Sequence, residues 1–512
     1  MNILLEAITQ WAKMTPDRVA LVGGDETDSL VELTYSALLC KVEQVAAELM
    51  AQKIDVLALR MENGLNWAVV DLAAMMANVV VVPIPTFFSP AQVEHILAQS
   101  GADALLGDWQ SKPYSLEIAQ DVSLTMAALP LRRLRRPTRA SYLEGTGKIT
   151  FTSGSTGHPK GVCLSNEHLC SVARSLANSV RGFAHTHLVL LPLSTLLENI
   201  TGIYVPLILG GTSYIFPGQR TGLLGSSQFN PHLFADILAG IKPDSIVLTP
   251  ALLLALISLV KLQPWLAESL KFVAVGGAKV SASLIKAAHD LHIPAFEGYG
   301  LSECGSVVCL NTPAHFQSGS CGKPLPHIQV RIAEDGELLV KGATALGYLN
   351  EPFHQAWLAT GDLADMDEQG YVTLLGRKKN LIVTAYGRNV SPEWIESEAL
   401  AFLPHVQFII TGDSQQALCA VMEVVDHAEE KISALNDTLP DYAQIRTVLM
   451  LDNPKAMADW YTNNGKLKRD EIEHCVTQLL AATPSDCRLK NQKVQRFDLP
   501  FQPSRMASLT TS

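Results

Sequence analysis

The N-terminal part of the chain alternates helical and strand-like hydrophobic patterns. Apolar residues recur at helical spacing in residues 42–50 and 67–76, whereas short apolar runs fill residues 55–60 and 79–84. Short apolar runs that alternate with helical segments are typical of βαβ units, in which helices connect parallel strands. We therefore expect a mainly parallel sheet in this part of the chain.

The same pattern continues towards the middle of the chain. Residues 188–216 predict a buried strand, a helix and a second strand, and residues 245–260 and 271–275 add further core elements. By contrast, residues 329–340 contain two strand-like runs around an Asp-Gly turn, which is a β-hairpin signal. We therefore expect an antiparallel appendage beside a large α/β core.

The pattern changes near residue 377, and this change predicts a second domain. A chain of 512 residues is also too long for one compact core. We expect an α/β protein with a large multi-sheet N-terminal domain (residues 1–377), a small mobile α+β C-terminal domain (378–485) and a tail (486–512). The basic, turn-rich residues 126–148 are expected to form a solvated connector.

Charge and composition argue against several classes of protein. The net charge of −11, from 39 basic and 50 acidic residues, argues against general nucleic-acid binding, which requires a basic face. It does not exclude a polyanionic small molecule, because local donors and magnesium can neutralise one. The nine cysteines are scattered and include no Cys-x-x-Cys pair. Reduced thiols in a cytoplasmic protein are therefore expected, and not disulfides or a zinc site.

Two apolar stretches of the chain have the composition of neither a targeting segment nor a membrane segment. The N-terminal stretch MNILLEAITQWAKM has Glu6 within its apolar part and no basic start, so it predicts an amphipathic helix and not a signal peptide. The most apolar window, residues 67–88, is interrupted by Asp71, Asn78 and two prolines. A buried helix followed by a strand explains this window better than a membrane span, so no transmembrane segment is expected.

Residues 149–165, ITFTSGSTGHPKGVCLS, carry the clearest chemical signal. A strand-like run leads into a loop of hydroxyls, glycines and one lysine. Glycines allow backbone N–H groups to face inward, and concave rows of such donors bind phosphate. A flexible linker is the alternative, but the strand before the loop and the apolar residues after it argue against a linker. The candidate phosphate-binding residues are Thr152, Ser153, Gly154, Ser155, Thr156, Gly157 and Lys160.

The segment EGYGLSE at residues 297–303 offers groups suited to a nucleotide. The flat ring of Tyr299, between Gly298 and Gly300, would give adenine a stacking surface at low steric cost. The carboxylate of Glu303, next to Ser302, can hold Mg²⁺, which prefers oxygen ligands. A core tyrosine and a surface glutamate are the alternative for an isolated segment. The position after a phosphate loop favours the nucleotide site.

These segments and three later ones resemble, in order, the motifs of the adenylate-forming superfamily, which includes acyl-CoA synthetases, peptide-synthetase adenylation domains and luciferases. The loop resembles the superfamily's phosphate loop, and EGYGLSE resembles its GYGxTE motif with serine in place of threonine. Residues 360–363 (TGDL), 386–396 (YGRNVSPEWIE) and 462–469 (TNNGKLKR) resemble its later motifs. The resemblance covers nearly the whole chain.

The resemblance implies how ATP is held. The phosphate loop with Lys160 would bind the β- and γ-phosphates, and Glu303 with Thr156 would position Mg²⁺. Asp362 would accept the ribose hydroxyls, and Arg377, in the Gly-Arg pair that follows, would lie near the ribose and the phosphates. The nucleotide site is therefore expected where segments far apart in the sequence meet.

The resemblance also implies that the C-terminal domain turns about Lys379 between two half-reactions. Before the turn, Lys466 would bridge the carboxylate of the acid and the α-phosphate of ATP while acyl-AMP and pyrophosphate form. After it, the loop around Gly387 would line the channel through which a thiol attacks the acyl-AMP. Lys466 is therefore expected to be catalytic, together with Glu303 and Thr156.

The acid is expected in an apolar tunnel built by residues 196–204 and by a run of small residues. We expect acyl contacts from Thr195, Gly276, Gly277 and Ala278. Two positions depart from the family pattern. Thr195 stands where relatives often carry a histidine, and Asn380 stands where they usually carry an acidic residue. The threonine is the more important change, because that position borders the carboxylate pocket in relatives.

The function implied by the resemblance is ATP-dependent activation of a medium- or long-chain fatty acid and its transfer to CoA. Transfer to the phosphopantetheine arm of a carrier protein is the alternative within this class. A non-catalytic nucleotide-binding scaffold and a luciferase-like oxygenase are alternatives from other classes. The presence of Glu303, Asp362 and Lys466 argues against the scaffold, and nothing in the sequence specifically favours the oxygenase.

Overall fold

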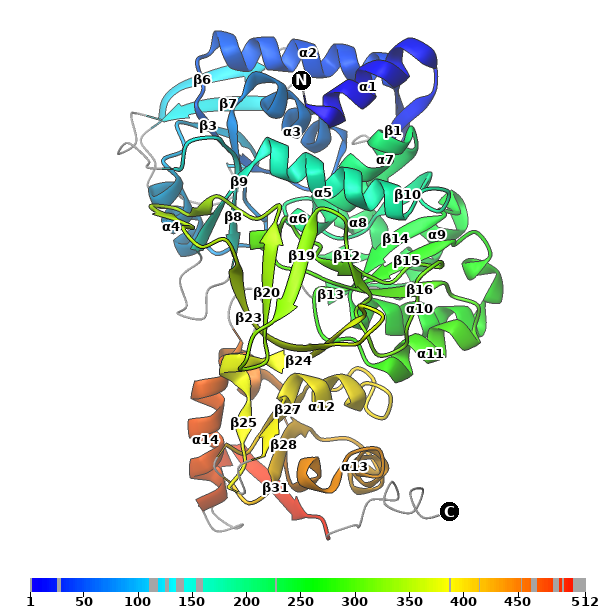
Figure 1. Cartoon of the computed structure of the whole chain (residues 1–512), viewed down its shortest axis with the longest axis vertical. Helices are drawn as coiled ribbons and strands as arrows, with labels where there is room; N and C mark the ends of the chain where they lie inside the picture. The colour runs from blue at the N-terminus through cyan, green and yellow to red at the C-terminus, as the bar shows by residue number, and fades with distance from the viewer. Residues whose placement is uncertain are drawn as a thin grey trace.

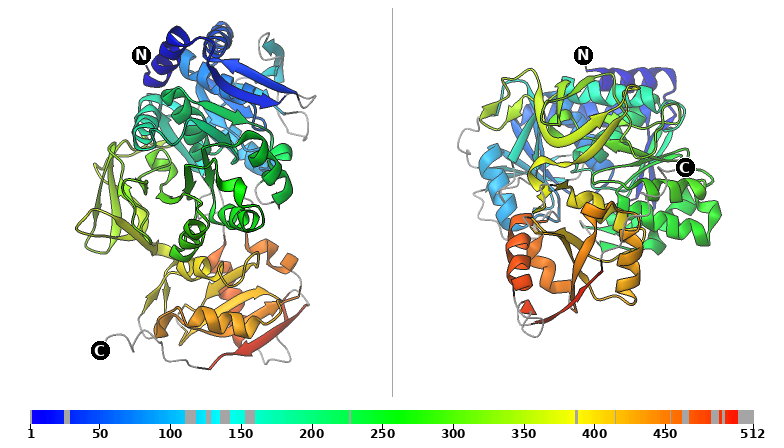
Figure 2. Two further views of the ribbon diagram at one scale, coloured as in Figure 1. Left: turned by 90° about the vertical axis from the view of Figure 1, so that its right-hand side faces the viewer. Right: turned by 60° about the horizontal axis from the view of Figure 1, so that its bottom comes forward.

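The computed structural model has a larger part, drawn from blue to yellow-green in Figure 1, and a smaller part at the bottom of that view, drawn from yellow to red. The two turned views in Figure 2 show the same two parts one above the other. The structure describes residues 2–24, 29–109, 118–124, 129–134, 142–152, 160–225, 228–385, 388–413, 415–452, 454–461, 467–481, 488–489 and 492–500.

One nine-stranded sheet of the larger part has the strand order β18-β17-β16-β15-β14-β10-β11-β1-β2. All neighbouring pairs from β16 through β1 are parallel, as the alternating hydrophobic pattern predicts. The strands are β1 (Val19–Gly24), β2 (Leu30–Thr34), β10 (Thr186–Val189), β11 (Thr212–Ile215), β14 (Ser245–Leu248), β15 (Phe272–Val275), β16 (Ala295–Tyr299), β17 (Cys309–Leu310) and β18 (Lys323–Pro324).

A second nine-stranded sheet has the order β22-β21-β9-β8-β4-β3-β5-β7-β6. Strands β8, β4, β3 and β5 are parallel neighbours, whereas β8 and β9 form an antiparallel pair that flanks the candidate phosphate loop. The strands are β3 (Val56–Arg60), β4 (Val80–Pro83), β5 (Ala104–Gly107), β6 (Ile118–Leu124), β7 (Leu129–Leu134), β8 (Thr146–Thr152), β9 (Lys160–Ser165), β21 (Gly347–Tyr348) and β22 (Glu351–Pro352).

Helices join the two sheets and cover their outer faces. One core contains side chains of both sheets and of α1, α2, α3, α5 and α7. A second core packs α9, α10 and α11 on the first sheet, and a third packs α4 on the second sheet. The helices are α1 (Ile3–Met14), α2 (Tyr35–Ala51), α3 (Leu65–Ala77), α4 (Pro90–Ser100), α5 (Asn166–Ser179), α6 (Leu196–Glu198), η1 (Asn199–Tyr204), α7 (Val205–Leu209), α8 (Gly218–Thr221), α9 (Pro231–Ile241), α10 (Pro250–Leu262), η2 (Pro264–Ala267), α11 (Ala282–Asp290) and η3 (Ser302–Cys304).

Short polar residues fix where several of these helices begin. The hydroxyls of Thr34, Ser165, Thr249 and Ser281 each accept a backbone N–H from the first turn of the helix that follows. The Ser89 hydroxyl does the same, and the Gln92 side chain accepts the backbone N–H of Ser89 in return, which completes a capping box. Such caps satisfy N–H groups that have no partner within the helix, so these helix starts are encoded locally.

A four-stranded antiparallel sheet links the larger part to the smaller part (Figure 1). It contains the predicted hairpin, β19 (Ile328–Ile332) and β20 (Glu337–Gly342), followed by β23 (Leu358–Met366) and β24 (Val372–Arg377). The short η4 (Lys378–Asn380) comes directly after β24. The domain boundary expected at residue 377 coincides with the end of β24, and a rotation there stays a prediction.

The smaller part is an α+β unit with helices on a five-stranded sheet of order β27-β28-β29-β31-β30. One core packs α12 and α13 against the sheet, and another packs η6 and α14 against it. The elements are β25 (Ile382–Val383), β26 (Asn389–Val390), α12 (Pro392–Ala399), β27 (Phe408–Thr411), β28 (Leu418–Glu423), α13 (Ala428–Asn436), η5 (Asp441–Ala443), β29 (Ile445–Leu451), η6 (Pro454–Trp460), α14 (Arg469–Ala481), β30 (Arg488–Leu489) and β31 (Gln492–Asp498). The larger part also contains a separate two-stranded sheet of β12 (Leu223–Leu224) and β13 (Gln228–Phe229).

Two expectations about segments without a clear pattern are corrected. The tail expected at residues 486–512 contains β31, which pairs antiparallel with β29. The connector expected at residues 126–148 contains β7, which pairs with β5 and buries Leu131. Neither strand carries the regular apolar alternation that identifies an amphipathic strand from sequence, so its place in a sheet depends on tertiary packing.

A buried ionic cluster lies in the larger part beneath β8. Lys148 Nζ is 2.7 Å from Asp71 Oδ1, and both side chains are at most 2% exposed. Lys148 also donates to Tyr204 Oη at 3.0 Å and to Asn199 Oδ1. Tyr204 and Asn199 in turn donate to Asp71 Oδ2 at 2.6 and 2.9 Å. The cluster therefore ties the strand that leads into the candidate phosphate loop to α3 and η1.

Within the described part of the chain, no helix combines the length and the apolar character that crossing a bilayer requires. The apolar window at residues 67–88 instead forms α3 and β4, as predicted. The eight cysteines in the described residues are free thiols, in agreement with the expectation for them.

Candidate active site

The candidate phosphate loop joins β8 and β9. The last residue pair between these strands is Thr152 with Lys160, so the two ends of the loop lie side by side. Thr152 and Lys160 are thus placed as expected at the mouth of the loop. The remaining candidates of the loop lie outside the described residues: Ser153, Gly154, Ser155, Thr156 and Gly157.

Tyr348 connects the loop lysine to the candidate magnesium ligand. Its Oη donates to Glu303 Oε1 at 2.9 Å, and Lys160 Nζ lies 5.1 Å from the centre of its ring. Strand β21 places the tyrosine there, because Tyr348 pairs with Val162, two residues after Lys160 on β9. Sequence reasoning missed Tyr348, which belongs to none of the recognised motifs. Tyr348 thus contacts both the ammonium group of Lys160 and the carboxylate of Glu303.

A second cluster contains Tyr299, Asp362 and Arg377. Tyr299 Oη donates to Asp362 Oδ2 at 2.6 Å, and Arg377 Nε lies 2.8 Å from Asp362 Oδ1. Asp362 and Arg377 face each other as register partners on β23 and β24, and Tyr299 ends β16. Three residues from separate motifs therefore meet around one carboxylate, as the sequence predicts.

Burial and neighbouring charges set the protonation of this cluster. Burial raises the pKa of Asp362, and the nearby carboxylate of Glu303 adds to this rise, whereas Arg377 and the Tyr299 hydroxyl oppose it. Burial, with the Asp362 charge added, raises the pKa of Tyr299 well above its ordinary value. The tyrosine therefore stays a hydrogen-bond donor at neutral pH.

Glycine is required at Gly300 because of a close backbone approach. A Cβ atom at this position would lie 1.7 Å from the backbone oxygen of Ser306. At Gly276, a Cβ would lie 3.2 Å from the backbone oxygen of Gly298. The small residues of both motifs thus allow two loops to pass close together beside Tyr299.

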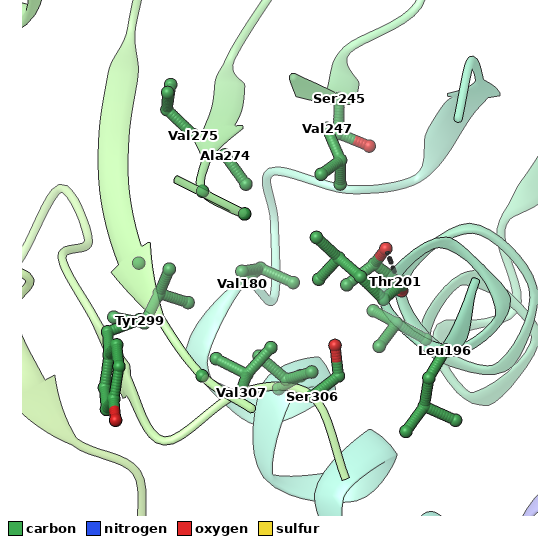
Figure 3. Close-up of a pocket in the computed structure, with 18 of the residues that line it drawn as sticks. Val180, Leu196, Thr201, Ser245, Val247, Ala274, Val275, Tyr299, Ser306 and Val307 are labelled. Atoms are coloured by element: carbon green, nitrogen blue, oxygen red, sulfur yellow. Dashed lines mark hydrogen bonds between the residues drawn. The ribbon is translucent and has the colours of Figure 1, made fainter. Parts of the chain in front are cut away.

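An apolar cavity of about 240 Å³ opens beside Tyr299 (Figure 3). Its walls come from β14, β15 and β16 on one side and from α5, η1 and residues 301–310 on the other. Three candidate acyl contacts, Thr195, Gly276 and Gly277, line it. The candidate nucleotide-binding residues Gly298, Gly300 and Ser302 line it as well. Ala278 is exposed and is not among the lining residues, which corrects its expected acyl contact. Thr195 donates its hydroxyl to the backbone oxygen of Pro192 at 2.6 Å.

A family comparison adds independent information. A sequence model of the family described as AMP-binding enzyme matches residues 8–349, more than half of the chain. The chain belongs to the AMP-binding enzyme family. The match includes the phosphate loop, Tyr299, Glu303 and Tyr348, and it ends before Asp362.

Known relatives of this AMP-binding enzyme include CoA ligases. It is 27% identical over 415 residues to the 2-succinylbenzoate–CoA ligase of Bacillus subtilis, with 77% of this chain and 82% of that protein covered. It is 29% identical over 433 residues to a long-chain-fatty-acid–CoA ligase of Mycobacterium bovis, with 71% and 72% covered. The relatives confirm the expected class of enzyme, an AMP-forming acid–thiol ligase. Because the two relatives are named for different acids, they do not select the acid.

A solved structure confirms the expected fold class. The o-succinylbenzoate CoA synthetase (MenE) of Bacillus subtilis, in complex with its acyl-adenylate intermediate, superimposes with a TM-score of 0.73 at 23% identity and covers 92% of this chain and 98% of its own. At this identity the likeness concerns the fold alone. The AMP-binding enzyme therefore has the multi-sheet architecture of the adenylate-forming type.

In the smaller part of the AMP-binding enzyme, one carboxylate connects the expected hinge to the start of α14. Asn380 Nδ2 donates to Glu393 Oε1 at 2.6 Å, and Arg469 Nε lies 3.1 Å from the same oxygen. Arg469 Nη2 also lies 2.7 Å from Glu396 Oε2. Asn380 is thus a donor to a carboxylate, a role that an acidic residue could fill only when protonated. Lys379 is exposed in η4, while Gly387 and Lys466 lie outside the described residues.

Proposed function

We propose that this AMP-binding enzyme activates a carboxylic acid with ATP to form acyl-AMP and pyrophosphate, and then transfers the acyl group to CoA. The observation that carries the proposal is that candidate nucleotide-binding groups adjoin one apolar cavity. Tyr299, which lines the cavity, donates to Asp362 opposite Arg377. Glu303, next to the lining residue Ser302, accepts from Tyr348, whose ring lies beside Lys160. Polar and charged groups of this kind beside an apolar pocket fit a molecule that is a nucleotide at one end and an acyl group at the other.

Each described residue has a part in this reaction. Lys160 offsets the charge of the β- and γ-phosphates, and Asp362 accepts the ribose hydroxyls beside Arg377 and Tyr299. Because the reacting carboxylate and phosphate are both anions, fixed donors must offset their repulsion. Each preorganised donor of this kind contributes about 3–4 kcal/mol in comparable sites. Holding the two reactants in line contributes about 7–11 kcal/mol more.

The residues present suit a magnesium ion that arrives with ATP. Glu303 offers a half-buried carboxylate whose orientation is fixed by Tyr348. Among the described residues no cluster of three or more potential metal ligands occurs. Mg²⁺ is commonly held by one or two carboxylates together with substrate phosphates, so one carboxylate at this position is sufficient. When bound, the ion would offset phosphate charge; Glu303 and Thr156 are the proposed protein ligands. A MenE structure of the same fold contains ATP and a magnesium ion, which supports the proposal that magnesium arrives with ATP.

Lys466, the hinge at Lys379 and the loop at Gly387 complete the proposal. Lys466 would bridge the acid and the α-phosphate in the first half-reaction, and the smaller part would then turn so that the Gly387 loop faces the acyl-AMP. The contacts of Glu393 with Asn380 and Arg469 support a smaller part that moves as one body, because they tie the hinge region to the start of α14. CoA is proposed as the acceptor because the relatives are named CoA ligases.

The proposed acid is a fatty acid of medium chain length. The cavity lining is predominantly apolar, which suits an alkyl chain. Its volume of about 240 Å³ is smaller than the roughly 300–1,000 Å³ of pockets for drug-sized ligands. The cavity therefore favours the shorter end of the range expected from the sequence. The free thiols are compatible with a cytoplasmic location, which also remains part of the proposal.

The proposed function is tested by pyrophosphate release with short- to long-chain fatty, aryl and amino acids, each with and without CoA and holo-carrier protein. We expect medium-chain fatty acids to support release, and thioester to form only with CoA. Lys466→Ala is expected to abolish ATP–pyrophosphate exchange, whereas Lys468→Ala, which removes only an exposed contact with Glu471, should retain it. Activity with aryl or amino acids alone would refute the fatty-acid assignment, and normal exchange by Lys466→Ala would refute the role of that lysine.

Replacing Tyr348 with phenylalanine is expected to raise the Mg²⁺ concentration for half-maximal pyrophosphate release about 10-fold. The change removes the hydrogen bond to Glu303 but keeps the ring beside Lys160, so the carboxylate loses its fixed orientation. Tyr371→Phe is the matched control, because the ring of Tyr371 also contacts a lysine, Lys323, at 4.6 Å. Equal Mg²⁺ dependence of Tyr348→Phe and the unmodified enzyme would contradict the positioning role.

A further inference from the structure

The cavity has a polar end that the proposed chemistry does not use. Three parallel strands form one wall, and His187 of β10, Ser245 of β14 and Phe272 of β15 are register partners at the N-terminal ends of these strands. Gly276 and Tyr299, which border the nucleotide site, lie at the opposite ends. Three residues of strand span about 10 Å. Figure 3 shows Ser245 and Tyr299 on opposite sides of the pocket.

The polar end is a chain of three hydrogen-bonding side chains. Ser245 Oγ lies 2.9 Å from His187 Nδ1, and His187 Nε2 lies 3.4 Å from Glu198 Oε1. The three side chains are almost fully buried, and both Ser245 and His187 line the cavity. Register partners on parallel strands face the same side of a sheet, so Ser245, His187 and Phe272 all face the space that the acyl group would fill. Burying a polar group next to an otherwise apolar space costs free energy of folding unless the group has a hydrogen-bond partner.

The chain can present Ser245 to the cavity in two ways. If Glu198 is ionised and the His187 proton is on Nε2, the serine donates to Nδ1 and its oxygen can accept a hydrogen bond. If Glu198 carries a proton and donates it to Nε2, Nδ1 donates to the serine, whose O–H is then available to the cavity. Burial raises the pKa of Glu198, while His187 opposes the rise. A hydroxyl group, which both donates and accepts, fits either arrangement.

A second carboxylate at this end is disfavoured. Among the described residues that line the cavity there is no lysine, arginine, aspartate or glutamate, and both ring nitrogens of His187 are already engaged, by Ser245 and by Glu198. An ionised carboxylate without a cationic partner is strongly disfavoured in such a space. This cavity therefore suits a neutral polar group and not the free carboxylate of a dicarboxylic acid, although one relative is named for such an acid.

We propose that Ser245, supported by His187 and Glu198, binds a hydroxyl group at the end of the acyl chain remote from the reacting carboxyl group, so that the preferred substrate is a hydroxylated acid of medium length. This inference rests on the proposed function, because it names the acid that the same cavity takes. Ser245 is a specificity-determining residue, while His187 and Glu198 are positioning residues that act through it. The hydroxyl of Thr201, which donates to the backbone oxygen of Leu197 at 2.7 Å, lies in the facing wall and can accept a further hydrogen bond.

The test compares kcat/KM for pyrophosphate release with octanoate, with its terminal-hydroxy derivative and with suberate, and repeats the comparison for neighbouring chain lengths. The unmodified enzyme is expected to prefer the hydroxy acid by about 10- to 100-fold at the best length, because an acid without a hydroxyl leaves unused the hydrogen bond that Ser245 can form in addition to its contact with His187. Ser245→Ala is expected to reduce this ratio to about 1. His187→Phe should reduce the ratio as well, since the serine then loses its partner.

Val247→Ala is the matched control, because Val247 lies on the same face of β14, two residues nearer the nucleotide site. It should lower kcat/KM for octanoate and the hydroxy acid alike and leave their ratio unchanged. The inference is wrong, while the proposed function stands, if the unsubstituted acid is used as well as its terminal-hydroxy derivative at every chain length tested. It is also wrong if suberate is the preferred substrate. If no carboxylic acid supports pyrophosphate release, the proposed function fails and the inference fails with it. If a variant does not fold, the ratio of kcat/KM for the hydroxy acid and the unsubstituted acid in the unmodified enzyme still tests the inference.

Discussion

Asp362→Ala is expected to lower kcat/KM for ATP by about 100- to 1,000-fold in pyrophosphate exchange. The carboxylate accepts the hydrogen bond of Tyr299 at 2.6 Å and faces Arg377 at 2.8 Å. Removing it deletes the proposed acceptor of the ribose hydroxyls and also releases the two side chains that it holds. The loss should therefore exceed that of one substrate contact, because the tyrosine ring and the guanidinium group lose their fixed positions together.

Two further variants separate these effects of Asp362. Asp362→Asn can still accept from Tyr299 but loses the charge that faces Arg377, so an intermediate loss is expected. Asp365→Ala removes an exposed carboxylate three positions further along β23 and should leave exchange unchanged. AMP binding measured by calorimetry should weaken in the same order as exchange. Normal AMP affinity in Asp362→Ala would contradict the assignment of the ribose site.

Lys148→Met is expected to lower the free energy of unfolding of the larger part by about 3–5 kcal/mol. The change leaves the carboxylate of Asp71 without its cation in a fully buried site and deprives Tyr204 and Asn199 of a shared partner. Burial lowers the pKa of Lys148, whereas the Asp71 charge raises it, so the pair depends on mutual compensation. Because Lys148 lies on β8, the loss should also disturb the strand that enters the phosphate loop.

The stability prediction is measured by urea unfolding followed by tryptophan fluorescence, since the buried Trp67 ring lies 5.8 Å from Lys148 Nζ. The double variant Asp71→Leu/Lys148→Met should recover most of the loss, because it removes both charges and fills the space with apolar atoms. Lys286→Met breaks an exposed ion pair with Asp290 and is expected to have little effect. A double variant no more stable than Lys148→Met would show that the charges are not the cause.

Local signals in the sequence were sufficient for much of the fold. The alternation of helical and strand-like runs predicts the parallel strands, because a strand buried on both faces needs a continuous apolar run and its crossover helix needs an apolar stripe. The Asp-Gly turn predicts the β19–β20 hairpin. The strand that leads into the candidate phosphate loop was predicted from its apolar run, and the β8–β9 pair lies there.

The meeting of Tyr299, Asp362 and Arg377 was foreseen through the resemblance of their motifs to a known superfamily, and not through periodicity. The family match supports the first of these motifs, and the geometry brings all three together. Tyr348 was not foreseen, because a lone tyrosine in a two-residue strand carries no motif. Its link between Lys160 and Glu303 depends on the register of β21 against β9.

The sequence by itself determined the class of fold, through its hydrophobic pattern, and the family, through the resemblance of its motifs to those of a known superfamily. Both rest on short stretches of chain that do not depend on the tertiary structure. The tertiary structure alone decided that Asp71, which interrupts an apolar helix, pairs with Lys148, and that β31 completes the C-terminal sheet. It also decided that Ser245, His187 and Glu198 form one polar chain at the end of the cavity. The physical reason is common to these cases: which polar side chains meet inside a core depends on strand register and helix packing, and a hydrophobic pattern specifies the buried face of an element but not its partner on the opposite side.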